Sequence, residues 1–285
     1  MTGPTAALLS GGTRLHLQHG PIDLIIGADG GRQDAFAAAE ARFQTVLQEL
    51  VADLTHLRCF EQQPLCGAIA GRMQQAVAPH QAQTFVTPMA AVAGAVAETV
   101  LEAMVTAAPV TRAYVNNGGD IALHLSGPAE FKVALGTAKG GRMGQTVITA
   151  DDPVRGIATS GQPGRSFSLG IADSVTVLAT KAADADVAAT LIANAVDLPD
   201  HPGILREPAG DLAPDSDLGR RLVVTRVPAL TATETKAALD RGTRIAQQMV
   251  DQRMINAAAL FLQGHAQVTG TPFMTQPTQE QIQHA

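Results

Sequence analysis

Four short runs of alternating or apolar residues follow one another in the middle of the chain, with no helical stretch between them. They lie at residues 110–116, 121–125, 131–135 and 145–149. Runs of this kind, separated by turn-forming residues, are typical of β-strands. Because strands and helices do not alternate strictly along the chain, an α+β fold is favoured over a doubly wound α/β fold.

Other segments show either strand or helix periodicity. Further strands are expected at residues 14–19 and 22–26, joined by a turn at Gly20-Pro21, and at 174–179, 221–227 and 256–262. Helices are expected at 35–57, 67–77, 184–196 and 233–251, and a small-residue helix begins at Thr87-Pro88. Asp34 is expected to cap the first helix. Residues 27–32 are expected to form a turn, and residues 197–217, rich in Pro, Gly and Asp, a long surface loop.

The length of 285 residues fits one large domain or two intimately packed ones. We expect one domain over residues 1–266, which could contain two intimately packed subdomains. From residue 267 to 285 Gln, Thr and Pro dominate, and this composition predicts a disordered tail.

Composition narrows the class of protein. A formal net charge of -6 and the absence of Trp disfavour a nucleic-acid partner. Cys59 and Cys66 match no common zinc spacing, so we expect two reduced or semi-buried thiols. The N-terminus has no secretory pattern, and Glu98 and Glu102 interrupt the apolar region at 85–110. We therefore expect a soluble, cytoplasmic protein with no membrane partner, whose Ala-rich helices could support a homodimer.

A glycine turn that carries a carboxylate lies between two of the predicted strands. Asn-Gly is the strongest short signal for a β-hairpin, so a plain turn is one interpretation. Two glycines exceed what a turn requires, however, and they allow a ligand to approach the backbone closely. The candidate binding residues of this turn, which begins at Asn116, are Asn117, Gly118, Gly119 and Asp120.

Asp186 and Thr190 are four residues apart on a predicted helix, so their side chains share one face. Oxygen ligands of this kind suit Mg²⁺ or Ca²⁺, and Mg²⁺ usually completes its coordination with phosphates and water. The alternative is that acids simply stabilise the start of this helix. That alternative explains Asp184 well and Thr190, a mediocre helix former, less well. The pair therefore indicates a site for a phosphate-bearing ligand.

Residues 156–166 combine small residues, hydroxyls and one Arg, as a phosphate-binding loop does. The segment is not a Walker A loop, because the lysine and the glycine spacing of that motif are absent. A flexible turn is the alternative. Its candidate ligand contacts are Thr159, Ser160 and Gly161. No His or Asp nearby in the sequence is marked as a partner for Ser160, and no catalytic residue is assigned.

Taken in order, these motifs resemble those of the ApbE superfamily, whose best-known members are FAD:protein FMN transferases. The resemblance covers roughly residues 85–196. Residues 87–94 and 14–21 resemble one uncharacterised cytoplasmic branch, uncharacterised protein family 0280. The matching motifs are Gly94 with Glu98 on the small-residue helix, Asn-x-Gly-Gly-Asp at 116–120, Ala-Thr-Ser-Gly at 158–161, Ser-Val-Thr-Val at 174–177 and Ala-Asp-x-x-x-Thr at 185–190.

The resemblance implies an ApbE-like, T-fold-like α+β architecture of mixed sheets flanked by helices. It also implies that Asp186 and Thr190 bind Mg²⁺, and that Asp120, the preceding glycines, Thr159 and Ser160 lie near a flavin nucleotide, FAD or FMN. In the transferase reaction the metal holds the FAD pyrophosphate, a threonine of a protein acceptor attacks it, and AMP is released. The sequence departs from the family pattern at two places. The family's His-x-x-Asp-Pro-x-Thr-Gly is missing from residues 165–173, and Ala93 replaces a lysine.

Three functional hypotheses follow. The first is an ApbE-like enzyme that binds a flavin nucleotide or related phosphate-bearing ligand with Mg²⁺ and performs FMN transfer, with a protein acceptor, or pyrophosphate cleavage. The second is a non-catalytic flavin-binding or carrier protein. The third is a divergent enzyme of sulfur or one-carbon metabolism on the same scaffold. Release of AMP from FAD and Mg²⁺ would favour the first, tight binding without turnover the second, and no flavin binding the third.

Overall fold

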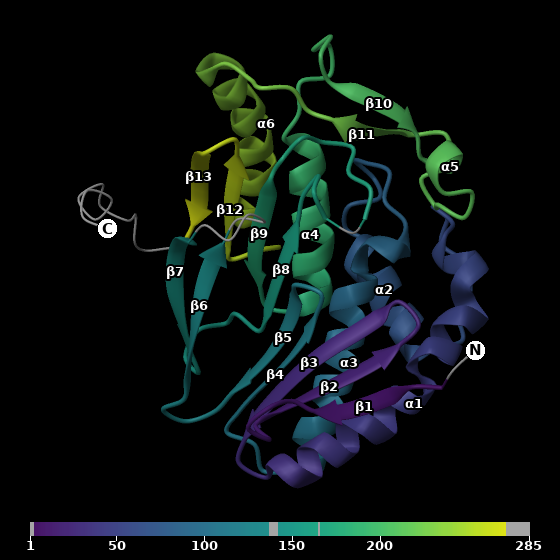
Figure 1. Cartoon of the computed structure of the whole chain (residues 1–285), viewed down its shortest axis with the longest axis vertical. Coiled ribbons are helices and arrows are strands. Elements are labelled where there is room, and N and C mark those ends of the chain that lie inside the picture. The colour runs from purple at the N-terminus through teal and green to yellow at the C-terminus, as the bar shows by residue number, and fades with distance from the viewer. Residues whose placement is uncertain (1–2, 137–141, 165, 272–285) are drawn as a thin grey trace.

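The computed structural model describes residues 3–136, 142–164 and 166–271, and within them a long antiparallel sheet organises the fold (Figure 1). The sheet has nine strands in the order β1-β2-β3-β4-β5-β8-β9-β12-β13, and all neighbours run antiparallel. The strands are β1 (Thr5–Leu8), β2 (Arg14–His19), β3 (Ile22–Asp29), β4 (Arg112–Asn117), β5 (Asp120–Leu125), β8 (Gly156–Ser160), β9 (Ser174–Ala179), β12 (Ala257–Leu262) and β13 (His265–Gly270). With helices on one face of this sheet, the predicted α+β class is confirmed.

Four long helices cover one face of the sheet and lie behind it in Figure 1. From one end of the sheet to the other, α1 packs on β2 and β3, α3 on β4 and β5, α4 on β8 and β9, and α6 on β12 and β13. The helices are α1 (Arg32–Leu57), α2 (Ala68–Val77), α3 (Val92–Ala107), α4 (Ala182–Ala195), the short α5 (Ala209–Leu212) and α6 (Ala232–Asp251), and a 3₁₀ turn, η1 (Pro88–Ala91), leads into α3. Their apolar side chains form the main core with the inner face of the sheet.

Two smaller β-hairpins complete the described fold. The first pairs β6 (Glu130–Gly136) with β7 (Arg142–Thr149) and covers the outer face of the central strands with a second apolar cluster that includes Leu123, Ile157 and Leu178. Because both of their faces are covered, β9 and β12 are buried along their whole length. The second hairpin pairs β10 (Leu205–Pro208) with β11 (Leu222–Arg226). We call residues 205–226, which include α5, the arm.

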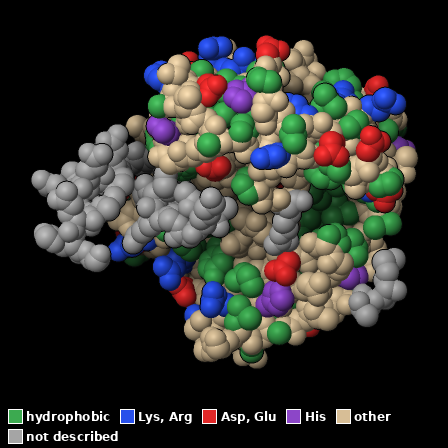
Figure 2. All heavy atoms as spheres, turned by 45° about the horizontal axis from the view of Figure 1, so that its top comes forward, with side chains coloured by type: hydrophobic (Ala, Val, Ile, Leu, Met, Phe, Trp, Pro, Cys, Tyr) green, Lys and Arg blue, Asp and Glu red, His purple; other side chains and the backbone are tan. Residues whose placement is uncertain are grey.

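Alternation of buried and exposed residues explains why β2 was predictable. Leu15, Leu17 and His19 are buried, whereas Arg14 and Gln18 are exposed. This period of two places the apolar side chains on the helix-covered face. Acidic and basic side chains are interspersed over the face seen in Figure 2.

The chain between β3 and α1 differs from the prediction. The expected turn at 27–32 is wrong for its first half, because β3 continues to Asp29, which pairs with Arg112 of β4. Gly30 and Gly31, both with positive φ, then make the turn, and Gly31 is the N-cap of α1. Asp34 lies inside the first helical turn and is not the cap.

Three short strands were not predicted. The expected loop at 197–217 contains β10 and α5, and β1 and β13 form the two edges of the main sheet. The predicted tail is wrong at residues 267–270, because these belong to β13, which pairs along the whole of β12. The rest of that prediction, from residue 272, lies outside the described residues.

Within the part of the chain that the structure describes, one helical stretch, Pro88–Ala107, is long and apolar enough to cross a membrane, with a mean hydropathy of 1.5. Half of that stretch's most apolar window is buried inside the fold. Its residues Ala95, Val100 and Met104 are fully buried in the main core. The stretch therefore packs as the expected buried small-residue helix.

Candidate functional site

Two of the sequence motifs meet at one cavity of about 500 Å³. Asp120, at the start of β5, contributes one carboxylate, and α4 contributes Asp186 and Thr190. The first residues of η1 and α3 form one wall, and residues 213–218 of the arm lie across from them. The cavity therefore lies where a β-strand, two helix starts and the arm come together.

The carboxylate of Asp186 lies at the N-terminus of α3. Its Oδ2 accepts a hydrogen bond from the backbone N–H of Gly94 at 3.0 Å. Burial raises the pKa of Asp186 well above its ordinary value, and the neighbouring charge of Asp120 raises it further. The backbone N–H groups of Ala93 and Gly94 act in the opposite direction but do not prevail. A cation in the cavity would oppose both effects that raise the pKa, since each of them disfavours the ionised carboxylate.

Gly94 and Glu98 determine how α3 and α4 cross. A Cβ on Gly94 would lie 2.3 Å from the carbonyl oxygen of Ala182, so no larger residue fits without movement. Glu98 Oε1 accepts the N–H of Ala183 in the first turn of α4 at 2.9 Å, and Oε2 lies 2.6 Å from Arg72 Nη1. The Glu98 side chain is only 11% exposed. This family pair therefore holds the crossing that presents Asp186, and Glu98 is a helix cap with an ion pair.

The Asn-Gly-Gly-Asp turn joins β4 to β5 directly, since Asn117 and Asp120 are paired across the hairpin. Gly118 and Gly119 have φ of 69° and 119°, which disfavour other residues. The Asn117 side chain donates to the carbonyl of Ala93 at 3.2 Å and thereby ties the turn to the start of α3. Asp120 is the member of this turn that lines the cavity, and Asn117, Gly118 and Gly119 are not among its lining residues. Open space adjoins Gly119.

The first half of the expected loop at 156–166 is a strand, β8 (Gly156–Ser160), whereas the ligand contact expected for this segment stays a prediction. A Cβ on Gly156 would lie 2.2 Å from the backbone of Lys181, and a Cβ on Gly161 would lie 2.6 Å from the carbonyl oxygen of Asp173. These glycines therefore allow close backbone packing.

Thr159, Ser160 and Gly161 are not among the described residues that line the cavity. The N–H of Thr159 lies 3.3 Å from Asp120 Oδ1, and its hydroxyl is 2.9 Å from that of Thr176 on β9. Thr159 therefore orients Asp120 from outside the cavity. Ser160 and Gly161 follow it at the end of β8.

Several cavity residues were not predicted from the sequence. Asp215 and Asp217 come from the arm, and the Thr87 hydroxyl donates a hydrogen bond to Asp217 Oδ2. Phe167, with 40% of its surface exposed, lies at the same cavity. The sequence contains this pair as Asp-Ser-Asp at 215–217. The pairing of β10 with β11 is what places the two aspartates at the cavity. The described lining thus has four aspartates and no Lys, Arg or His.

Carboxylates share the cavity without forming a dense cluster. Among the described residues, no group of three or more His, Cys, Asp or Glu is placed to hold one metal ion. Cys59 and Cys66 are free thiols, with Cys66 exposed. Any metal in the cavity would therefore use at most two carboxylates, together with hydroxyl, water or ligand oxygens.

The fold and the site define an α+β protein with an acid-lined cavity at a helix crossing, built on an antiparallel sheet. The family model described as "AbpE bacteria" matches residues 6–268, and the chain belongs to this family. The expected resemblance to the ApbE superfamily and to protein family 0280 is confirmed.

The chain is also similar to several relatives, and solved structures align with it. The UPF0280 protein of Methanothrix thermoacetophila is 40% identical over 39% of this chain and 46% of its own length, and that of Methanococcoides burtonii is 38% identical over 41% and 48%. The chain thus spans about half the length of these relatives. The apo structure of Pseudomonas stutzeri flavinyl transferase ApbE aligns with a TM-score of 0.47 at 11% identity, covering 94% of this chain and 93% of that one. For the flavin transferase ApbE from Vibrio cholerae the values are 0.44, 12%, 93% and 96%.

Proposed function

We propose that this protein binds a flavin nucleotide, or a related phosphate-bearing ligand, together with Mg²⁺ in the cavity formed by Asp120, Asp186 and Thr190. The observation that carries the proposal is the partly buried carboxylate of Asp186, with its raised pKa, beside that of Asp120, in a cavity whose described lining has no basic side chain. A phosphate would be repelled by such a lining unless a divalent cation came with it. In this proposal a cation therefore accompanies the anionic ligand into the cavity.

The donor set fits Mg²⁺. This ion is usually bound through one or two carboxylates and completes its coordination with water and substrate phosphates. Asp186 and Thr190 on α4, with Asp120 on β5, supply oxygen donors of that kind, and no third carboxylate is needed. When bound, the ion would neutralise charge on a pyrophosphate and polarise its oxygens.

The chain's own residues have other roles in this proposal. Phe167 offers an exposed ring at the cavity, against which a planar flavin could pack. Asp215 and Asp217 of the arm close the opposite side and favour the cation over a bare anion. We infer that positioning and charge neutralisation would dominate transfer of FMN to a protein acceptor, or cleavage of a pyrophosphate bond. A cytoplasmic location belongs to the same proposal.

The composition of the cavity also supports a second candidate function. The described lining has no His or Lys that could accept a proton at neutral pH, and the family's histidine motif is missing from 165–173. A non-catalytic flavin-binding or carrier protein needs no such base. The two functions differ in turnover and share the metal site.

The experiment that tests the site compares two substitutions of one residue. Asp186→Asn keeps an oxygen that can accept the Gly94 N–H but removes the charge, whereas Asp186→Ala removes both. FAD binding is measured by calorimetry with Mg²⁺ and with EDTA, and AMP release is followed separately. We expect both variants to weaken Mg²⁺-dependent binding by about tenfold or more, as for other residues that support a metal.

Asp184→Asn is the matched control, since this acid lies on the same helix but outside the cavity. Its binding should equal that of the unmodified protein. AMP release would favour transfer or cleavage, and binding without release would favour the carrier. If Asp186→Asn binds FAD with unchanged Mg²⁺ dependence, Asp186 is only a cap of α3 and the proposal fails. A protein that binds no flavin at all would point to an enzyme of another small-molecule pathway.

A further inference from the structure

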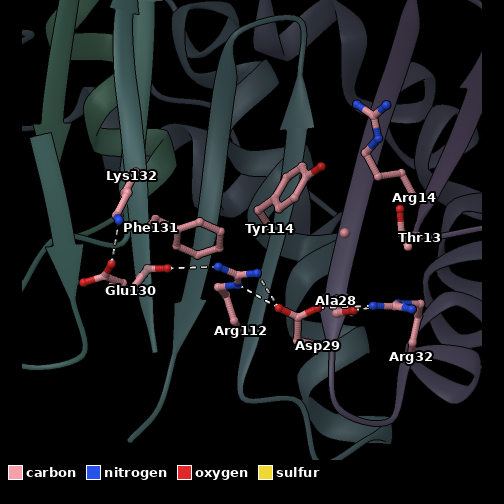
Figure 3. A pocket seen from close by; sticks show the side chains of 11 residues that line it. Thr13, Arg14, Ala28, Asp29, Arg32, Arg112, Tyr114, Glu130, Phe131 and Lys132 are labelled. Carbon is pink, nitrogen blue, oxygen red and sulfur yellow. Dashed lines mark hydrogen bonds and ion pairs between the residues drawn. The ribbon is translucent and has the colours of Figure 1, made fainter. Parts of the chain in front are cut away.

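A second cavity, of about 660 Å³, lies on the outer face of the sheet and shares no lining residue with the first (Figure 3). It is bounded by the start of β2, the end of β3, the start of β4, the first residue of α1 and the first residues of β6. Its size is in the range of small-molecule sites. No motif in the sequence pointed to it, because its residues come from five separate elements.

Two aromatic rings form one wall of this cavity. The ring of Tyr114 lies directly over Gly27, where an added Cβ would be 2.4 Å from Tyr114 Cε1. Phe131 meets Tyr114 edge-on, with ring centroids 6.1 Å apart and an interplanar angle of 83°. The guanidinium of Arg112 lies 5.5 Å from the Phe131 centroid. Because Gly27 has no side chain, the ring of Tyr114 can lie against the backbone of β3 on the outer face of the sheet.

The charges of the cavity are unbalanced. Its lining has four cationic side chains, Arg14, Arg32, Arg112 and Lys132, against two carboxylates. Asp29 is shared by Arg32 at 3.2 Å and Arg112 at 2.6 Å, and Glu130 lies 3.4 Å from Lys132. The surplus of two positive charges favours an anionic ligand.

Three polar groups at the cavity are uncommitted. Dashed lines in Figure 3 join Arg112 and Arg32 to Asp29, and Lys132 to Glu130, but none reaches Thr13, Arg14 or Tyr114. Within the described residues, Arg14 has no ion pair, and the hydroxyls of Thr13 and Tyr114 have no hydrogen-bond partner. A guanidinium and two hydroxyls therefore remain available beside the aromatic wall.

We propose that this cavity binds a small planar aromatic molecule that carries a phosphate or carboxylate. The ring packs against Tyr114 and Phe131, and the anionic group accepts hydrogen bonds from Arg14. Guanidinium groups suit both anions, because their donors match a pair of anionic oxygens. Unlike the acid-lined cavity, this site supplies its own positive charge and needs no metal. It is thus independent of the proposed flavin function.

Tyr114 makes a direct test feasible, because the chain has no other Tyr and no Trp. Intrinsic tyrosine emission therefore comes from this cavity alone. Phenyl phosphate is titrated in the presence of EDTA, with emission as the reporter of the site and calorimetry as the measure of affinity. Benzyl alcohol tests the ring alone, inorganic phosphate the anion alone, and benzoate the carboxylate.

We expect saturable binding of phenyl phosphate with a change in Tyr114 emission, and weaker binding of both partial probes. Arg14→Ala should weaken phenyl phosphate about tenfold, the loss expected for a hydrogen bond to a charged group. Arg241→Ala, an exposed arginine on α6, should change nothing. Binding in EDTA separates this site from the flavin proposal, which depends on Mg²⁺.

Three outcomes would overturn the inference. One is the absence of saturable binding, and another is affinity that survives Arg14→Ala. The third is inorganic phosphate binding as tightly as phenyl phosphate, which would indicate a simple anion patch. Arg14 is exposed, so its replacement leaves the folded protein available for each measurement.

Discussion

The carboxylate of Asp186 is subject to opposing electrostatic effects. The first turn of α3 favours its ionised form through the N–H groups of Ala93 and Gly94, whereas burial and Asp120 favour the protonated form. The second pair of effects is larger, so the pKa is raised. A carboxylate that only capped α3 would not need a second carboxylate nearby. The closeness of Asp120 to Asp186 is therefore the feature that indicates more than a cap.

At another cavity, a partly buried histidine predicts how stability depends on pH. Burial lowers the pKa of His80 below its ordinary value of 6.5, and the other residues around its cavity are uncharged. Since the unfolded chain binds the proton more readily, His80 costs no stability above about pH 6.5, and stability falls as the pH drops below that value. We expect His80→Gln to reduce the loss between about pH 7.5 and about pH 5.5, measured by urea denaturation.

His265→Gln provides the control for this measurement, since His265 is exposed at the start of β13. It should follow the unmodified protein at both pH values. An identical loss of stability in His80→Gln and in the unmodified protein would show that other groups cause the acid sensitivity.

Helices α3 and α4 each complete the N-terminus of the other. Asp186 of α4 accepts the N–H of Gly94, and Glu98 of α3 accepts the N–H of Ala183. Helix starts leave such N–H groups without partners inside their own helix. The two caps are possible because Gly94 lets the backbones approach.

Replacement of Gly94 tests this crossing. Gly94→Ala would place a methyl group 2.3 Å from the carbonyl oxygen of Ala182, and we expect it to lower the free energy of unfolding by about 3 kcal/mol or more. Gly71→Ala on α2 is the matched control, because open space surrounds its position. That change should raise stability by about 0.5–1 kcal/mol. Equal effects of the two substitutions in chemical denaturation would contradict the proposed crossing.

Periodicity predicted the long elements well, because each buries one regular face. Leu15 and Leu17 of β2, and Phe36, Phe43 and Leu50 of α1, repeat at strand and helix spacing and are buried. The edge strand β1 escaped prediction because all four of its residues are exposed, so no alternation marks it. In and just after β8, Gly156, which packs against the start of α4, and Gly161, which packs against the Asp173 backbone, resembled loop residues.

Prediction of the site was limited in the same way. Asp120, Asp186 and Thr190 could be identified from their local motifs, and the structure brings them to one cavity. Asp215 and Asp217 could not be, because their position depends on how the arm folds back over the chain. The outer cavity depends on side chains contributed by β2, β3, β4, β6 and α1, and no local pattern encodes such a meeting.

Across the whole molecule, the arm is held against the segments of chain that precede and follow α4. Arg206 donates to the carbonyl of Leu169 at 2.8 Å and pairs with Asp197 at 2.6 Å, with both side chains largely buried. The N–H of Val224 also donates to the carbonyl of Ser168 at 2.9 Å. These contacts fix the β10–β11 hairpin of the arm, whose residues Asp215 and Asp217 line the acid-lined cavity. The expectation of one domain over residues 1–266 stays a prediction.

Loss of this ion pair should loosen the arm. We expect Arg206→Ala to destabilise the protein by about 2 kcal/mol, somewhat less than removal of one partner from a fully buried pair. Backbone hydrogen exchange should quicken at residues 205–226 more than in β9 or β12. Combining it with Asp197→Ala should cost less than the two single changes together, by roughly 1 kcal/mol. Strictly additive effects would mean that the arm is held by its other contacts.

Because α3 and α4 cap each other, the acid-lined cavity keeps its shape only while these two core helices stay packed together. A carboxylate that a ligand would need is the same group that completes a central helix, so heat that separates the helices also dismantles the binding surface. Conversely, an occupant of the cavity would hold both helices in place. A bound ligand would then protect the central helices α3 and α4 against thermal unfolding more than the edges of the molecule.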